Sequence, residues 1–393
     1  MFTRLASTRL RAVAAAAALT VAVFATAADL NGSHPDSYTV RKGDTLWDIS
    51  AKFLKKPWLW PEIWQANPQI GNPHLIYPGD VISLAYLNHV AVQPGPREEA
   101  PVNAVNLSDV EPFLKDLSIA DQYENLPYVV ALEENRMRAS GGQKAYVLGL
   151  SGAAVGQRYA VIRPTLRYTQ TRLASNGRYL SYNEDLDYRG RRLKGDTIDW
   201  DRQWTSSALA EGPMELLGYE MKRVNAGTVT RLPSGDVDTT TLDLDENMFE
   251  VRAGDRVVPV SANAYDLQFF PHAPKVPQPA GKLQVAAVAD GMLFGGTHDV
   301  IAISGGSREG IDNGTVFSIW RPGKYANDRV RHPESSRMDD SPRDGAGRVG
   351  LPDEYASHAM VFRTFEKVSY ALVMDGSRPT RIGYTLKHPD ATE

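Results

Sequence analysis

The sequence predicts a small α+β module of strand–helix–helix–strand (βααβ) order, followed by mainly-β C-terminal domains, either small barrels or a sandwich. Residues 37–85 hold a short alternating strand, two helical stretches with apolar faces and a closing strand. Beyond residue 108, short Val-, Ile-, Tyr- and Leu-rich runs are separated by glycine turns, as is typical of β-rich folds. A chain of 393 residues is long enough for two or more folding units.

The N-terminus has the features of a secretory signal peptide. An apolar run from Ala12 to Phe24 follows three positive residues, Arg4, Arg9 and Arg11, and Ala25-Thr26-Ala27 offers a cleavage site. The run is shorter than the roughly 20 apolar residues that span a bilayer, so we expect residues 1–27 to be removed. Loss of three arginines would take the net charge from −4 to about −7. The sequence therefore predicts a periplasmic protein.

Composition and spacing exclude several classes of protein. There is no cysteine, which excludes thiol nucleophiles and with them papain-like peptidases and L,D-transpeptidases. The net charge of −4 disfavours a nucleic-acid binder, which needs a basic face. The eight histidines show no HxH or HExxH spacing, so we expect no metal site. Gly345, Gly347 and Gly350 match a dinucleotide motif but lie between prolines in a polar segment, so we expect no cofactor.

Catalysis by side chains is not predicted either. No GxSxG elbow is present, and the acidic pairs that could serve a glycosidase fall in expected loops: Asp185-Asp187, Asp243-Asp245 and Asp339-Asp340. A glycosidase with unrecognised carboxylates stays open as an alternative, but we expect a protein that is not an enzyme.

The N-terminal module can be followed element by element. Tyr38-Thr39-Val40 alternates as a strand, Gly43 turns the chain, and Thr45 with Asp48 forms a capping box that opens a helix. Pro61 suits the start of a second helix, which the Asn67-Pro68 step ends. Tyr77-Pro78-Gly79-Asp80 predicts a turn before the closing strand Val81–Leu84.

Three landmarks of this stretch resemble a LysM module: GDTL at 43–46, Asn67-Pro68, and IYPGD at 76–80. The resemblance implies binding of N-acetylglucosamine-containing glycans, chiefly peptidoglycan, in a shallow groove between two loops. It implies that one wall is formed by Gly43, Asp44, Thr45 and Leu46, and the other by Asn72, Leu75, Ile76 and Tyr77. From the residues themselves, Asp44 can also be a helix cap, and Leu46 and Ile76 can be core residues.

The segment between the two helices, KKPWLWPEIW, holds Trp58, Trp60 and Trp64. Trp60 and Trp64 are four residues apart and share a helix face. Tryptophans can serve as sugar platforms, but so close to a helix start they more often pack in a core or an interface. We favour packing and keep the glycan platform as the alternative.

The remainder of the chain divides into segments. Residues 86–108 are proline-containing and of mixed charge, which predicts a linker, so we expect the module to be tethered and not packed against the rest. A second linker at 271–281 separates β-rich domains at 109–270 and 282–393. Residues 183–206 are dense in charge and predict an exposed insertion, and 324–357 predict a mobile loop.

A short pattern recurs in both β-rich domains. In this pattern a glycine is followed by a polar residue and then by alternating apolar residues. It occurs at Gly156-Gln157, Gly254-Asp255 and Gly314-Thr315 and, in degenerate form, at Gly383-Tyr384. We interpret these as related β units in which each glycine supplies a turn of positive φ before a strand.

The order of modules is similar to the LysM proteins associated with the type IV pilus secretin, the TsaP family, whose C-terminal region is described as FlgT-like. That resemblance implies a non-catalytic adaptor that holds peptidoglycan and grips an outer-membrane secretin ring. A single shallow groove supplies about −4 to −7 kcal/mol, so a multimeric partner is needed for firm anchoring. The alternative is a wall-binding accessory protein that targets or regulates a peptidoglycan hydrolase.

Overall fold

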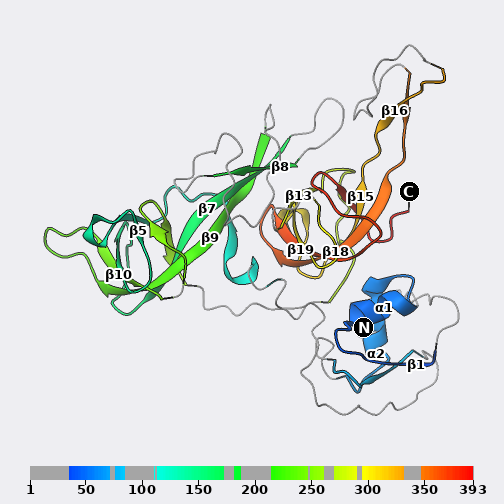
Figure 1. The fold of residues 1–393 in the computed structure, drawn as a ribbon, viewed down its shortest axis with the longest axis horizontal. Coiled ribbons are helices and arrows are strands. Elements are labelled where there is room, and N and C mark those ends of the chain that lie inside the picture. The colour runs from blue at the N-terminus through cyan, green and yellow to red at the C-terminus, as the bar shows by residue number, and fades with distance from the viewer. Residues whose placement is uncertain are drawn as a thin grey trace, which may run out of the picture.

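The computed structural model describes residues 35–70, 76–84, 110, 113–171, 181–186, 214–246, 248–260, 270–289, 294–331 and 347–392. The predicted signal peptide, the linker at 86–108 and most of the charged insertion lie outside these residues. Figure 1 shows a helical N-terminal module beside an elongated body of β-strands. Within the described ranges, no helix is long and apolar enough to cross a membrane.

The N-terminal module has the predicted βααβ order. Strand β1 (Ser37–Thr39) pairs with β2 (Val81–Ser83) in antiparallel register, and α1 (Leu46–Phe53), η1 (Pro57–Leu59) and α2 (Trp60–Gln65) lie between them in sequence. The predicted capping box opens α1, because the Thr45 side chain accepts from Asp48 N–H and the Asp48 carboxylate accepts from Thr45 N–H.

The first β-rich domain is a closed six-stranded barrel. Its strands are β4 (Tyr128–Leu132), β6 (Lys144–Leu148), β7 (Arg158–Thr171), β9 (Met214–Arg231), β10 (Thr240–Leu244) and β12 (Arg256–Pro259). They pair around the ring in the order β4-β6-β10-β9-β7-β12, and β12 returns to β4. Strand β3 (Leu117–Ala120) extends the sheet beside β9, and β8 (Ser181–Asp185) beside β7, while β5 (Arg138–Ala139) and β11 (Val251–Arg252) form a separate pair.

The second β-rich domain is a barrel of the same topology. Its sheet order is β13-β14-β19-β18-β15-β20, with β13 (Val285–Val288), β14 (Val300–Ile303), β15 (Val316–Arg321), β18 (Glu354–Thr364), β19 (Ser369–Gly376) and β20 (Thr385–Lys387). Val285 N–H donates to Tyr384 O at 2.8 Å and Gly383 N–H to Val285 O at 2.8 Å, which closes the ring between β13 and β20. In both barrels the strands, numbered in chain order, pair as 1-2-5-4-3-6. The predicted fold class, a βααβ module followed by mainly-β domains, is confirmed.

The two barrels also match hydrogen bond by hydrogen bond. Gly254 N–H donates to Val129 O and Val129 N–H to Asp255 O, as Gly383 and Tyr384 do with Val285. The same exchange links Gly156-Gln157 to Val229 and Gly314-Thr315 to Val361. All four glycines of the predicted repeat have φ between +83° and +100°. The interpretation of these segments as related β units, each opened by a positive-φ glycine, is therefore confirmed.

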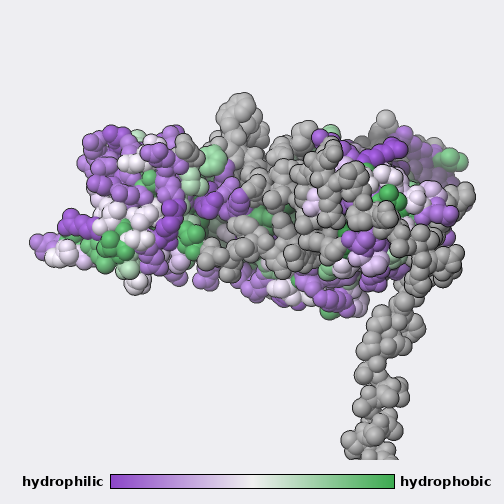
Figure 2. All heavy atoms as spheres, turned by 90° about the horizontal axis from the view of Figure 1, so that it is seen from below, coloured by the Kyte–Doolittle hydropathy of each residue, from purple (hydrophilic) through white to green (hydrophobic). Residues whose placement is uncertain are grey.

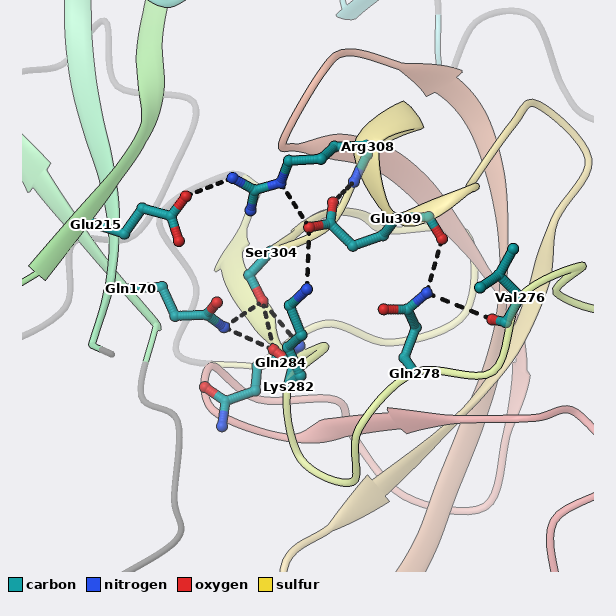
Figure 3. Close-up of polar contacts among 10 residues, drawn as sticks. Gln170, Glu215, Val276, Gln278, Lys282, Gln284, Ser304, Arg308 and Glu309 are labelled. Atoms are coloured by element: carbon teal, nitrogen blue, oxygen red, sulfur yellow. Dashed lines mark hydrogen bonds and ion pairs between the residues drawn. The ribbon is translucent and has the colours of Figure 1, made fainter. Parts of the chain in front are cut away.

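Polar side chains at the ends of β7 and β9 fix one barrel to the other. Figure 3 shows Gln170 reaching Lys282 O at 2.6 Å and Ser304 at 3.1 Å, and Arg308 bonding both Glu215 and Glu309. Burial alone would raise the pKa of Glu309, but hydrogen bonds from Gly306 N–H, Arg308 and Lys282 outweigh it and lower that pKa.

A buried carboxylate joins the barrels as well. Glu220 of β9, which is 1% exposed, accepts from Tyr168 at 3.0 Å and Thr165 at 2.7 Å within its own domain. It also accepts from Tyr370 of β19 at 3.2 Å. Arg363 of β18 donates to the main-chain oxygens of Phe113, Leu114 and Leu117. Buried charges need such partners, so the two barrels form one body.

Two segment predictions need correction. Residues 324–357 were expected to be a mobile loop, but β16 (Tyr325–Asn327) and β17 (Arg348–Gly350) pair as a two-stranded ladder that projects from the second barrel in Figure 1. Residues 354–357 already belong to β18. The expected linker 271–281 is packed on the second barrel, since His272 N–H donates to Gly314 O and Gln278 donates to Glu309 O.

Candidate glycan-binding site

Two loops of the N-terminal module meet at the ends of its two strands. Val40 N–H donates to Asp80 O at 2.8 Å, and Gly79 N–H donates to Val40 O at 2.8 Å. These bonds place the turn at 41–44 beside the turn at 77–80. The structure therefore brings together the described parts of the two predicted groove walls.

The first loop is a tight turn that leaves its backbone open to solvent. Gly43 has a φ of +88°, and no atom lies within 4 Å of the position that a Cβ would take. Asp44 N–H donates to Arg41 O at 3.0 Å, and the Asp44 carboxylate accepts from Arg41 N–H at 2.9 Å. The main chain at Gly43 is therefore exposed and rigidly held, as a hydrogen-bonding surface for a sugar must be.

Asp44 itself is engaged within the protein. Its carboxylate accepts from the Tyr38 hydroxyl at 2.8 Å and from Lys52 Nζ at 3.0 Å, besides Arg41 N–H. Burial alone would raise the pKa of Asp44, but these three hydrogen bonds lower it below its ordinary value. Asp44 therefore holds the shape of the loop, and the sequence did not single out its partners Tyr38 and Lys52.

The remaining described wall residues divide into core and rim. Leu46 is fully buried and Ile76 is 1% exposed, so their side chains belong to the core. The side chain of Thr45 is engaged in the capping box at the start of α1. Tyr77 is half-buried, and its N–H donates to Asp80 at 3.1 Å. Asn72 and Leu75 lie outside the described residues.

Asn67 ties the second helix to the closing strand. Its side-chain amide donates to Ile63 O at 2.7 Å and Ser83 O at 2.9 Å, and its oxygen accepts from Ser83 N–H at 2.7 Å and from Gln69 at 2.9 Å. Asn67 is fully buried, so these bonds satisfy a polar group that would be costly without them. The Asn67 side chain of this landmark is therefore structural.

Comparison with known proteins agrees with this geometry. Residues 38–85 match the family model described as LysM domain. This stretch is a LysM domain. LysM domains are binding modules for peptidoglycan and other carbohydrates and are not catalytic. An uncharacterized protein of Bacillus subtilis (strain 168), YqbP, is 39% identical over 62 residues, which cover 13% of this chain and 28% of that protein.

Trp58, Trp60 and Trp64 of the LysM domain face the second barrel and the segment that leads into it. Trp64 stacks on Phe270 with ring centroids 5.4 Å apart and planes at 16°, and Trp60 lies 5.8 Å from the same ring. Trp58 lies 4.9 Å from the ring of His358 on β18. The packing interpretation of these tryptophans is confirmed.

The LysM domain is consequently docked, and the expectation that it is tethered without packing is wrong. Lys56 and Asp390 add an ion pair of 2.9 Å beside the aromatic contacts. The sequence missed Phe270 and His358 because each lies about two hundred residues or more from the tryptophans. In the sequence, the adjacent Phe269 and Phe270 next to the proline-rich break are the signal that could have pointed to this contact.

Two side chains of the second barrel, Asp375 and Tyr355, contact the ring of His358. Its Nδ1 lies 2.9 Å from Asp375 and 2.7 Å from the Tyr355 hydroxyl. Burial, followed by the Asp375 charge, raises the pKa of Tyr355. These contacts orient the His358 ring against Trp58. Among the described residues, no three His, Asp or Glu side chains gather as metal ligands would.

Proposed function

We propose that this protein is a non-catalytic periplasmic adaptor. The LysM domain holds peptidoglycan, and the two-barrel body binds an outer-membrane secretin ring of the type IV pilus machinery and fixes it to the cell wall. The N-terminal 27 residues direct export and are then removed.

The docked LysM domain is the observation that carries this proposal. The loop at Gly43, where we expect the glycan to bind, remains open to solvent. Trp58, Trp64 and Lys56 join the domain to the second barrel and the segment that leads into it. Buried bonds through Glu220 join the second barrel to the first. A load applied at the glycan would therefore pass through packed side chains to both barrels, as an anchor requires.

Affinity supports a multimeric partner. One shallow groove of neutral hydrogen bonds gives millimolar to micromolar binding, on the order of −4 to −7 kcal/mol. A ring that holds many copies multiplies this affinity through effective concentration. The LysM match covers a single copy, residues 38–85.

The test is capture of the partner by the intact protein. Solubilised outer membranes are passed over immobilised protein, once untreated and once after digestion of peptidoglycan, and captured proteins are identified. A secretin captured in both arms supports the proposal. Capture of a hydrolase, or of wall fragments that vanish after digestion with nothing else retained, would overturn it in favour of a wall-binding accessory protein.

A further inference from the structure

The duplicated barrels allow their side chains to be compared position by position. The exchanged bonds at Val129 and Val285 fix the correspondence, and the pairing of Arg256 with Tyr128 and of Thr385 with Gln284 confirms it. A third bond agrees, since Tyr123 O accepts from Leu126 N–H as Pro279 O accepts from Lys282 N–H. The corresponding residues are Arg256 and Thr385, Tyr128 and Gln284, and Tyr123 and Pro279.

In the first barrel, Arg256 fills the space between the last strand and the segment that precedes the first strand. Its guanidinium carbon lies 5.4 Å from the ring centroid of Tyr123 and 5.6 Å from that of Tyr128. Its Nε donates to Tyr123 O at 3.0 Å, and another nitrogen donates to Gly254 O. A flat cation between aromatic faces and carbonyl oxygens is a stable arrangement for arginine.

In the second barrel the three corresponding side chains are smaller, and a cavity takes their place. Pro279, Gln284 and Thr385 all line a pocket of about 770 Å³ between the proline-rich segment and strands β15 and β20. Such a volume is typical of ligand sites in proteins. By the same correspondence, Pro279 O and Gly383 O are the counterparts of Tyr123 O and Gly254 O, the two oxygens that accept from Arg256, and both residues line the cavity.

We propose that this cavity binds an arginine side chain presented by an extended segment of a partner protein. The first barrel holds a guanidinium at the corresponding position, against two main-chain oxygens and two rings, of which the second barrel keeps the oxygens. The cavity is larger than one arginine side chain, and its apolar lining, which includes Val276, Phe317 and Leu386, suits apolar neighbours of that arginine.

The charges around the cavity are compatible with a cation. Asp353 and Lys387 both line it and are paired at 2.8 Å, so the charge of Lys387 is offset by its partner. Lys387 also lies over the ring of Trp320, with its Nζ 4.5 Å from the centroid. His388, an exposed residue, also lines the cavity.

The test uses the purified full chain and synthetic octapeptides. A panel carries one central arginine among alanine, proline and leucine residues, and each peptide has a matched version with citrulline, which keeps the shape without the charge. We expect at least one arginine peptide to bind with a Kd below about 1 mM, and its citrulline match to bind at least tenfold more weakly.

Two variants locate the site. Thr385→Arg supplies the side chain that fills the first barrel and should abolish peptide binding, while Thr385→Ser keeps the cavity open and should bind as the wild type does. The urea unfolding transition of the barrels should be unchanged in both, which shows that the second barrel is folded. No saturable binding, equal binding of the citrulline peptides, or equal binding to Thr385→Arg would each overturn the proposal. These readouts need no secretin, so they stand apart from the proposed function.

Discussion

Removal of the Phe270 ring should release the LysM domain from the second barrel. Phe270 is 41% exposed and contacts two tryptophans, at 5.4 and 5.8 Å. Each aromatic pair contributes about 0.5–1.5 kcal/mol beyond its buried area. Phe270→Ala should therefore weaken docking by about 1–3 kcal/mol, a shift of roughly 5- to 150-fold in the docking equilibrium. The Trp58–His358 contact is left intact.

The absence of cysteine makes this shift measurable by crosslinking. Lys56 and Asp390 form an ion pair across the interface and are 41% and 37% exposed, so Lys56→Cys with Asp390→Cys gives one defined pair. A short bismaleimide should join them rapidly in the otherwise native chain and slowly with Phe270→Ala. Lys56→Cys with Arg136→Cys, on the first barrel, is the control that should not react within one molecule.

Slow crosslinking of the pair even with Phe270 present would refute the docked arrangement, and equally rapid crosslinking with and without Phe270 would refute the contribution assigned to that ring. Loss of crosslinking together with loss of peptidoglycan binding would instead indicate an unfolded LysM domain. We expect peptidoglycan binding to persist in Phe270→Ala, because the open loop at Gly43 does not contact this interface.

Three further outcomes follow from the contacts above. Asn67→Ala removes the hydrogen bonds that the Asn67 side chain makes with the main-chain N–H and the main-chain oxygen of Ser83. It should lower the unfolding free energy of the LysM domain by about 2–4 kcal/mol, measured by urea titration. Gly43→Ala, at a φ of +88°, should cost about 1 kcal/mol and weaken binding to chitin oligosaccharides, measured by calorimetry, if the loop backbone contacts sugar. Glu309 has a lowered pKa, so its contribution to stability is present above its unfolded value near 4.5 and is lost as pH falls through the folded value. Glu309→Gln should therefore flatten the acid dependence of the denaturation midpoint below pH 4.5.

The LysM domain could be predicted from sequence because its signals are local. The capping box at Thr45 and Asp48 and the turn at Gly43 each depend on residues at most three positions apart. The same holds for the four glycine turns of the barrels. Local hydrogen bonds of this kind leave a trace in a short stretch of sequence.

Other features depend on contacts between distant residues and could not be predicted. Strand β7 holds Pro164 and β9 holds Gly218 and Gly227, so these strands of 14 and 18 residues resemble several short ones. Their register shifts near Pro164 show how the proline is accommodated. The β16–β17 hairpin has few aliphatic residues and buries no continuous face, so no period-2 pattern marked it. The partner of the tryptophans could only be found in three dimensions.

The degenerate repeat at Gly383-Tyr384 shows which parts of the pattern the barrel fold requires. In the first barrel, Asp255 is fully buried and accepts from Arg252 N–H at 2.7 Å and from Arg163 through two bonds of 2.8 Å. Tyr384 stands in its place in the second barrel, yet its N–H still donates to Arg381 O at 3.1 Å and Val285 N–H still donates to its carbonyl. The glycine and the main-chain bonds thus suffice for the turn, and the side chain after the glycine is free to diverge. Side chains can therefore differ between the two barrels at Asp255 and Tyr384, and at Arg256 and Thr385, without loss of the fold. Such differences allow two barrels of one topology to bind different partners.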